Sequence, residues 1–288
     1  MSIVDDFLSL LELEPLAVNR YRGSNRDIGT GRVFGGQVFA QALVAARRTV
    51  IEPREAHSVH GYFLREGDFR APIIYDVDRP RDGGSFTSRR VTAIQHGEAI
   101  FHLSASFHKS EPGLDHQVAM PEVPPPESLP NELDLIRANP QRLPEALRDV
   151  LIQDRPIDFR PILPADPLAE RPPVPSEQAR RMLWFRVPVA LPDTPILHQA
   201  VLAYASDYGF LPTSLAPHGV AWRDPRLQIA SLDHTLWMHR PFRADEWLLY
   251  VNDSPSACGA RGCVRGQVFS RDGRLVASAA QEGLIRVR

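Results

Sequence analysis

Lysine and cysteine are the residue types that this chain of 288 residues nearly lacks. Lys109 is the only lysine, so arginine carries almost all of the positive charge and can bind phosphate or carboxylate groups through paired hydrogen bonds. Cys258 and Cys263 have an odd spacing, which in an extended segment places side chains on opposite faces. We therefore expect neither a disulfide nor a cysteine metal site, and we interpret both cysteines as small packing residues.

A strong charge imbalance and a long apolar run are also absent. The net charge is −2 and the pI is about 6.6, which gives no electrostatic reason to expect nucleic acid or an anionic membrane surface as a partner. No run of about 18 apolar residues is present to span a membrane. The N-terminal segment MSIVDDFLSLLELEPL is acidic and amphipathic, unlike a signal peptide. These features predict a cytoplasmic protein.

Several catalytic and nucleotide-binding motifs are missing. There is no G-x-S-x-G elbow, so a Ser-His-Asp nucleophile is not expected, and there is no glycine-rich loop of the Walker or Rossmann type. The pairs His57 and His60, and His234 and His239, have odd spacings, which on strands point to opposite faces. Neither pair forms a metal site without a β-bulge, and we expect no metal and no redox cofactor.

What the chain does contain is an internal repeat. Its two copies comprise residues 35–48, 57–69 and 96–107, and residues 198–210, 230–242 and 272–283. Each copy has the pattern of an apolar helix, a strand and a hairpin closed by a glycine turn, with Gly97 and Gly273 at the same place in the hairpin. The repeat predicts one architecture built twice.

Each copy is predicted to contain one buried helix, at Gly36 to Arg48 and at Ile196 to Tyr208. Their side chains are apolar or small on nearly every side, which is typical of a helix inside the protein. Strands are expected at Pro72 to Arg79, Ser85 to Gln95 and Ala99 to Phe107. A buried helix with an antiparallel meander, present twice, is an α+β arrangement, but periodicity alone does not choose among such folds.

The composition changes between the two copies. Of the 27 prolines, 15 lie between Ser110 and Gln178, and proline removes a backbone donor and fixes φ, so long strands are not expected there. A loop of this length is normally a linker or an ordered wrap. We predict an N-terminal unit at residues 1–110, a proline-rich connecting segment at 111–178 that crosses over the outside, and a C-terminal unit at 179–288.

A set of sequence blocks, in order along nearly the whole chain, carries a family resemblance. They are RVFGGQVFAQAL, HSVHGYFLREGD, PIIYDVDRPRDGGSFTSRRVTAIQ, YASDYGFLP, IASLDHTLWMHRPF, EWLLY and ASAAQEGLIR. With these blocks the chain resembles the acyl-CoA thioesterase II family. The resemblance implies a double hotdog, in which two units each have a central helix wrapped by a curved antiparallel β-sheet. It also implies hydrolysis of medium- to long-chain acyl-CoA to free fatty acid and CoA.

The resemblance further implies a catalytic trio of Asp, Thr and Gln that holds the hydrolytic water. These roles fall on Asp207, Ser231 and Gln281, so serine stands where the family usually has threonine. Both hydroxyls donate and accept hydrogen bonds, but serine lacks the methyl group that stiffens χ1. The chemistry fits thioester hydrolysis, because a carboxylate accepts the water's proton while a hydroxyl and an amide orient it.

Asp207 also breaks a local rule. An acid at the C-terminal end of a predicted helix is disfavoured by the helix dipole, and departures of this kind tend to mark functional positions. The plain alternative is a surface acid just before a helix stop at Gly209. If Asp207 is not the base, Asp233 and His60 are the next candidates.

The first copy lacks the acid and the amide. Ala45 stands where the second copy has Asp207, and Ala105 stands where it has Gln281. We therefore expect one site per chain.

Donors for a developing oxyanion are expected at the start of the first helix. Gly35, Gly36 and Gln37 open that helix, its first N–H groups have no partner within the helix, and glycine lets a substrate approach the backbone closely. The alternative interpretation is a plain turn into a helix.

Two other functions stay open at this point. A hydratase or dehydratase of acyl thioesters needs an Asp and a His on one helix segment, and the second helix offers Asp207 without a histidine beyond it. A non-catalytic acyl-CoA-binding module would give Asp207 a structural role only. Exposed sheet edges need covering, so a homo-oligomer, dimer or tetramer, is also expected, with acyl-CoA as the small-molecule partner.

Overall fold

The first half of the chain wraps six antiparallel strands around one helix in the computed structural model, which describes residues 2–29, 31–143, 145–166, 168 and 172–288. Its elements are α1 (Ile3–Leu11), β1 (Glu14–Ala17), β2 (Arg20–Gly23), α2 (Gly35–Arg47), β3 (Glu55–Phe63), β4 (Ile73–Asp82), β5 (Phe86–Gln95) and β6 (Glu98–His108). Every side chain of α2 from Gln37 to Ala46 is buried, as its apolar sequence predicts. The β5–β6 hairpin turns at Gly97, whose φ of 81° is a conformation that glycine adopts without steric cost.

The second half repeats this plan. Its elements are β8 (Arg180–Arg186), α5 (Pro195–Ser206), η4 (Leu211–His218), β9 (Leu227–Ser231), β10 (Asp233–Met238), β11 (Leu248–Cys258), β12 (Arg261–Ser270) and β13 (Leu275–Val287). The β12–β13 hairpin closes at Gly273 with a φ of 87°, in the same way as its counterpart in the first half. The helix and the hairpin predicted for each copy of the repeat are therefore confirmed.

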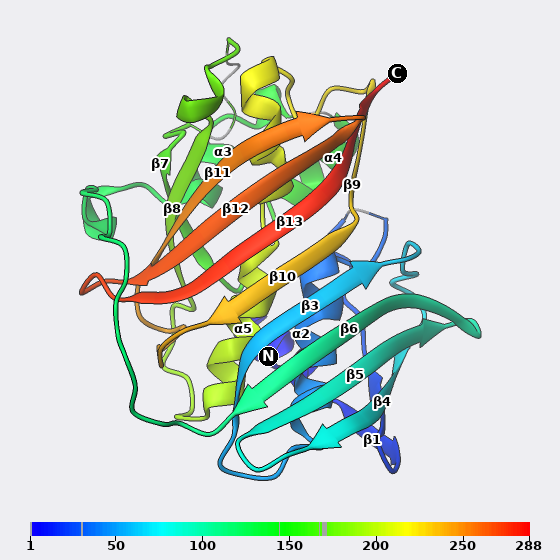
Figure 1. Cartoon of the computed structure of the whole chain (residues 1–288). Helices are drawn as coiled ribbons and strands as arrows, with labels where there is room; N and C mark the ends of the chain where they lie inside the picture. Colours follow the sequence, from blue (N-terminus) through cyan, green and yellow to red (C-terminus); the bar gives the residue numbers. More distant parts are fainter. Residues whose placement is uncertain (1, 30, 144, 167, 169–171) are drawn as a thin grey trace.

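Antiparallel pairing of β3 with β10 joins the two halves into one 13-stranded sheet. The strand order is β1-β2-β4-β5-β6-β3-β10-β13-β12-β11-β8-β7, where β7 (Asp158–Leu163) comes from the proline-rich segment, and β9 pairs with the C-terminal part of β13. Figure 1 shows β3 and β10 side by side at the centre of the molecule. At this seam Val59 lies opposite Leu236, and both side chains are completely buried. The sequence predicted two sheets but not the pairing that unites them.

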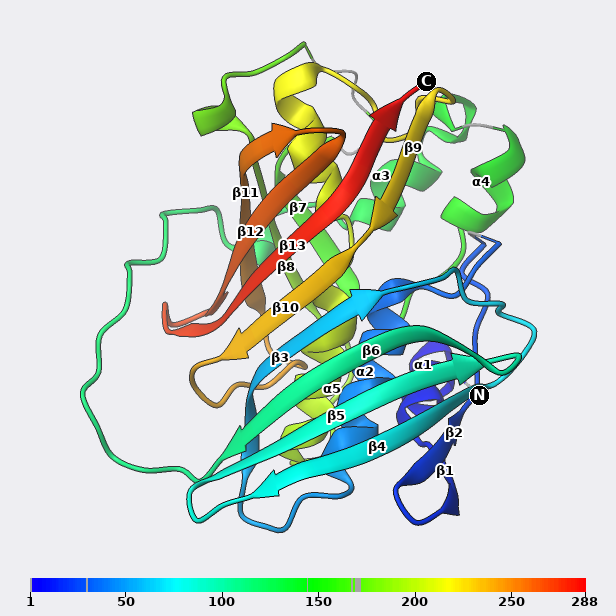
Figure 2. The same ribbon diagram turned by 45° about the vertical axis from the view of Figure 1, so that its right-hand side comes forward.

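The two central helices lie on the same face of the sheet and pack against each other (Figures 1 and 2). They approach each other closely at Gly36, where a Cβ atom would lie 2.5 Å from the Tyr204 carbonyl oxygen. The N-terminal end of α2 therefore meets the C-terminal end of α5, and the two units share one hydrophobic core. This arrangement confirms the predicted α+β double hotdog.

The proline-rich segment is an ordered wrap with short elements of its own. These are η1 (Pro126–Ser128), α3 (Glu132–Arg137), η2 (Pro140–Arg142), α4 (Glu145–Leu151), β7 (Asp158–Leu163) and η3 (Ser176–Gln178), while residues 144, 167 and 169–171 lie outside the described residues. Its first part passes the β12–β13 hairpin, where the Gln117 amide donates to the Gly273 carbonyl at 2.8 Å. Strand β7 tolerates Pro161 because it pairs only with β8, at one edge of the sheet.

Two expectations about local structure need correction. Helix α5 ends at Ser206 rather than Tyr208, so Asp207 is the capping residue and not part of the last turn. Cys258 and Cys263 do not share one extended segment, because a turn at residues 259–260 places them on the separate strands β11 and β12. Both thiols are free.

The close approach at Gly36 gives a prediction about stability. A Gly36→Ala substitution should lower the free energy of unfolding by about 1–3 kcal/mol, because the new Cβ meets a backbone carbonyl that cannot rotate away. Chemical denaturation monitored by circular dichroism measures this change. Gly113→Ala is the matched control, since nothing lies within 4 Å of a Cβ built there. Equal stabilities of the two variants would contradict the proposed helix–helix contact.

Candidate active site

Asp207 lies where the two central helices meet. It caps the C-terminus of α5, and the chain then turns through Gly209, whose φ is 62°. One carboxylate oxygen, Oδ1, accepts a hydrogen bond from Gln281 Nε2 at 2.8 Å. The other, Oδ2, faces the start of α2, where a Cβ on Gly35 would lie only 2.8 Å away. Glycine at this position is what allows the carboxylate to approach the helix.

Gln281 connects the other two residues of the predicted trio. Its side chain points inward from β13 and is 1% exposed. In addition to Asp207, Nε2 donates to Ser231 Oγ at 3.0 Å. Both amide hydrogens are therefore used to hold a carboxylate and a hydroxyl together, across 74 and 50 residues of chain. The Gln281 Oε1 atom is buried without a hydrogen-bond partner among the described residues.

Ser231 is placed by an interruption between β9 and β10. Strand β9 ends at Ser231 and β10 begins at Asp233, while the Leu232 carbonyl accepts from the Phe63 N–H at 2.9 Å. The Asp233 carboxylate accepts from the Glu282 N–H at 2.6 Å, which completes the local backbone bonding. Because of this interruption, β9 pairs with residues 283–287 of β13, and β10 pairs with residues 277–280 of the same strand.

The N-terminus of α2 lies beside Asp207, because a Cβ on Gly35 would be 2.8 Å from Asp207 Oδ2. The first N–H groups of a helix have no partner within the helix, and the helix dipole makes this end positive. Since Gly35 is the first residue of α2, the Asp207 carboxylate lies beside that positive end. The dipole conflict that the sequence predicted at the C-terminus of α5 is thus offset by a second helix from the other unit.

Of the three residues that open α2, Gln37 differs from the two glycines. Its side chain is buried, with Nε2 donating to Asn25 Oδ1 at 2.8 Å and Oε1 accepting from the Arg26 N–H at 3.3 Å. The Gln37 side chain therefore holds the segment before α2. Because the Gln37 N–H donates to the Phe34 carbonyl at 3.1 Å, Gly35 and Gly36 stay the candidates for backbone donors to an oxyanion.

The residue that precedes Asp207 is also fixed. Ser206 Oγ lies 2.8 Å from His234 Nε2, and the Ser206 carbonyl accepts from the Tyr250 hydroxyl at 2.9 Å. His234 is 0% exposed, and burial lowers its pKa, although the nearby Asp207 carboxylate acts in the opposite direction. Burial, together with the Asp207 charge, raises the pKa of Tyr204 to about 12. In each case burial disfavours the charged form, so the His234 ring and the Tyr204 hydroxyl are both neutral near pH 7.

The two alternative bases are not part of the hydrogen-bonded trio. His60 is exposed on the outer face of the sheet and its ring bonds to Ser58 Oγ at 3.2 Å. The Asp233 carboxylate accepts a hydrogen bond from the Glu282 backbone N–H, and burial raises the pKa of Asp233. Neither side chain is hydrogen-bonded to Ser231 or Gln281 among the contacts of the described residues.

A bulge changes the geometry expected for the first histidine pair. The register of β3 against β6 shifts between Ala56 and Ser58, so His57 bonds to Ser106 Oγ at 2.8 Å on the outer side of the sheet.

Among the residues that the structure describes, no group of three or more His, Cys, Asp or Glu is arranged to hold a metal ion. Within the same residues, no helix is long and apolar enough to cross a membrane.

The sequence analysis missed the partners that surround Ser206. His234 lies on the inward face of β10 with Leu236 and Met238, and this alternation was a signal in the sequence that it is buried. No comparable signal pointed to Tyr250. Ala45 and Ala105, which the alignment of the repeat sets opposite Asp207 and Gln281, lie in the apolar core of the first unit.

Comparisons with known proteins show which family this chain resembles. The family model described as "Acyl-CoA thioesterase" matches residues 170–284, and "Acyl-CoA thioesterase N-terminal domain" matches residues 24–108. Acyl-coenzyme A thioesterase 8 of Homo sapiens is 42% identical, over 97% of this chain and 88% of the human protein. Acyl-CoA thioesterase 2 of Haemophilus influenzae is 40% identical, over 99% of this chain and 98% of that protein. The crystal structure of acyl-CoA thioesterase II TesB2 from Mycobacterium marinum is also similar, with a TM-score of 0.79, 42% identity and coverage of 97% and 98% of the two chains.

The burial of His234 predicts a pH dependence of stability. Because its pKa in the folded protein lies below the ordinary value of 6.5, its contribution is fully present above pH 6.5 and is lost as the pH falls below that value. Between pH 6.5 and 5 the free energy of unfolding of the unsubstituted protein should fall faster than that of His234→Gln, by up to about 1.4 kcal/mol per pH unit. Denaturant titrations across this range measure the two slopes. Substitution of the exposed His116 by Gln should leave the slope unchanged, and identical slopes for all three proteins would refute the prediction.

Proposed function

The chain belongs to the acyl-CoA thioesterase family, and on this premise we propose that it hydrolyses medium- to long-chain acyl-CoA to a free fatty acid and CoA, using a water molecule activated by Asp207. The observation that carries the proposal is the pair of hydrogen bonds from Gln281 Nε2 to Asp207 and Ser231, at 2.8 and 3.0 Å. A carboxylate, a hydroxyl and an amide that converge in this way can hold a water molecule and accept its proton.

In the proposed reaction Asp207 is the general base. It takes a proton as the water oxygen attacks the thioester carbonyl carbon, and the carbonyl oxygen becomes an oxyanion. Collapse of this intermediate breaks the carbon–sulfur bond, and the proton held by Asp207 passes to the departing CoA sulfur. Ser231 and Gln281 orient the water and the carboxylate, and their hydrogen bonds lower the entropic cost of reaching the reactive arrangement.

The oxyanion is proposed to bind at the N-terminus of α2. Two features support this assignment: Gly35 and Gly36 open α2, where N–H groups have no partner within the helix, and the positive end of the helix dipole lies beside Asp207. Donors fixed in place before the reaction stabilise developing charge without reorganisation. Carboxylate base and backbone donors together are sufficient for hydrolysis, so the proposal includes no metal or redox cofactor.

The surroundings of His234 favour hydrolysis over the hydratase or dehydratase alternative. That chemistry needs an Asp and a His that both reach the substrate. His234 is fully buried between the rings of Phe39 and Phe210, with centroid separations of 4.9 and 5.7 Å, and its Nε2 atom is engaged by Ser206. A non-catalytic binding module would have no need of the convergent trio.

The remaining features of the proposal concern organisation. We assign residues 1–110 and 179–288 to two hotdog units and 111–178 to the segment that connects them, with a single site at the junction of α2 and α5. Two of the sheet edges are already covered by the pairing of β3 with β10. A homo-oligomer, dimer or tetramer, and a cytoplasmic location stay predictions.

Removal of the proposed base tests the mechanism. Asp207→Asn should lower kcat by roughly 10²- to 10⁴-fold, because an amide cannot accept the proton, while KM changes little. Release of CoA thiol from decanoyl-CoA measures both constants. Asp233→Asn is the matched control, since it changes a nearby carboxylate that bonds only to backbone. Loss of activity in Asp233→Asn with full activity in Asp207→Asn would reassign the base.

Substitutions at Ser231 test the hydroxyl. Ser231→Ala removes the acceptor for Gln281 Nε2 and should lower kcat by about tenfold or more, as expected when an orienting hydrogen bond is lost. Ser231→Thr keeps the hydroxyl and stiffens χ1, and should retain or raise kcat. The same decanoyl-CoA assay compares the three proteins. If Ser231→Ala kept the full rate, the hydroxyl would have no part in orienting the water.

A further inference from the structure

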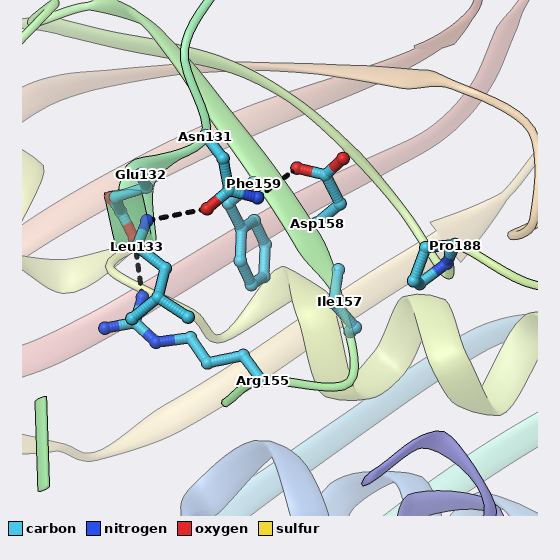
Figure 3. Close-up of a pocket in the computed structure, with 8 residues that line it drawn as sticks. All are labelled: Asn131, Glu132, Leu133, Arg155, Ile157, Asp158, Phe159 and Pro188. Carbon is cyan, nitrogen blue, oxygen red and sulfur yellow. Dashed lines mark hydrogen bonds and ion pairs between the residues drawn. The ribbon is translucent and has the colours of Figure 1, made fainter. Parts of the chain in front are cut away.

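Tyr208 directly follows the proposed base, and its side chain is directed away from the site into the connecting segment. Figure 3 shows this region, where a cavity of 170 Å³ lies between the start of α3, β7 and Pro188. We infer that the connecting segment positions Asp207 for catalysis by clamping Tyr208 with the buried pair Glu132 and Arg155. The inference rests on the proposed function and adds two positioning residues from outside both hotdog units.

The Tyr208 hydroxyl is held in a charged cluster. It donates to Glu132 Oε2 at 2.6 Å and accepts from Arg155 Nη1. The same Arg155 nitrogen donates to Glu132 Oε2 at 2.8 Å, and Figure 3 shows the guanidinium directed at this carboxylate. The side chains of Glu132 and Arg155 are only 7% and 18% exposed. Burial, followed by the Glu132 charge, raises the pKa of Tyr208 well above its ordinary value, so the hydroxyl keeps its proton.

The ring and the backbone of Tyr208 are fixed as well. The ring stacks on Phe159 of β7 with a centroid separation of 4.2 Å and an interplanar angle of 17°. Arg181 of β8 donates to the Tyr208 carbonyl at 3.2 Å and lies 3.7 Å from the Glu132 carboxylate. The residue after Asp207 is thus held through its hydroxyl, its ring and its carbonyl oxygen.

A base at a helix end needs such support. The last carbonyl groups of a helix have no intrahelical partner, so the end of α5 is free to fray unless other elements hold it. Ser206 is held by His234 and Tyr250 on one side of Asp207, and Tyr208 is held by the connecting segment on the other. A displacement of about 1 Å at the reacting groups costs roughly 10²-fold in rate. By holding Asp207 in place, the clamp therefore maintains the rate of hydrolysis, although Glu132 and Arg155 do not contact the substrate.

The rival interpretation is that Glu132 and Arg155 only attach the connecting segment to the C-terminal unit. Buried ion pairs often contribute little net stability, but removal of one partner leaves the other charge buried and unpaired. A purely structural role would thus lower the melting temperature and leave the kcat of the folded enzyme unchanged. The two interpretations therefore predict different kcat values for variants of Glu132. They also differ on whether the loss of kcat depends on the presence of Asp207.

The experiment uses the full chain and decanoyl-CoA, with kcat, KM and the melting temperature measured for each variant. Tyr208→Phe removes only the hydroxyl and keeps the stacked ring, and Glu132→Gln removes only the charge. Tyr75→Phe is the matched tyrosine control, because its buried hydroxyl donates to Gln41 Oε1 at 2.6 Å in the first unit. Asp245→Asn is the matched carboxylate control, because Asp245 pairs with Arg243 at 2.8 Å away from the site.

We expect Tyr208→Phe and Glu132→Gln to lower kcat by about 10- to 100-fold with KM changed less than about threefold. Both controls should lose melting temperature and keep kcat. In an Asp207→Asn background, adding Glu132→Gln should lower kcat no further, since residues that act through one group are not additive. If Glu132→Gln does not fold, Tyr208→Phe alone and combined with Asp207→Asn decides the question.

The outcomes separate the two proposals. A normal kcat in Tyr208→Phe and Glu132→Gln, or an additive loss in the Asp207→Asn background, would overturn the clamp while Asp207 remains the base. A normal kcat in Asp207→Asn itself would overturn the proposed base and the clamp together. Equal losses of kcat in the controls would also overturn the clamp, because the effect would then follow stability and not position.

Discussion

The antiparallel pairing of β3 with β10 is the constraint on which the rest of the structure depends. Its register places Val59 opposite Leu236 and Gly61 opposite His234, with the inward side chains completely buried. A slip by one residue would turn every side chain of β10 to the other face, so burial specifies this register strongly. Because the pairing fuses two sheets into one, α2 and α5 are brought together over a shared core, and the start of one helix meets the end of the other.

This meeting of helix ends sets the electrostatics of Asp207. At the end of α5 alone, a carboxylate faces the negative end of a dipole. In the folded chain the positive end of α2 lies beside it, at a distance that only glycine at position 35 permits. The Gln281 amide adds a hydrogen bond to the charged form. An arrangement that is unfavourable within one element is thus compatible with the stability of the whole protein, because another element supplies the opposite charge.

The two units contribute differently to the site, although they share one architecture. The second unit supplies Asp207, Ser231 and Gln281, and the first unit supplies the N-terminus of α2. Ala45 and Ala105, their counterparts in the alignment of the repeat, lie in the apolar core of the first unit. The connecting segment, which belongs to neither unit, reaches back to the residue after Asp207. Three parts of the chain that are separate in sequence therefore have to fold together before the site is complete.

The sequence by itself determined the repeated elements and the chemical groups. The apolar pattern predicted both buried helices, and the glycine turns at Gly97 and Gly273 marked both hairpins. The family resemblance supplied the double hotdog and the identities of Asp207, Ser231 and Gln281. Only the tertiary structure decided that β3 pairs with β10, that Gly35 faces Asp207, and that Glu132 and Arg155 hold Tyr208. The physical reason is that periodicity reports which face of its own element a side chain occupies, whereas contacts between distant segments depend on how complete elements pack against one another.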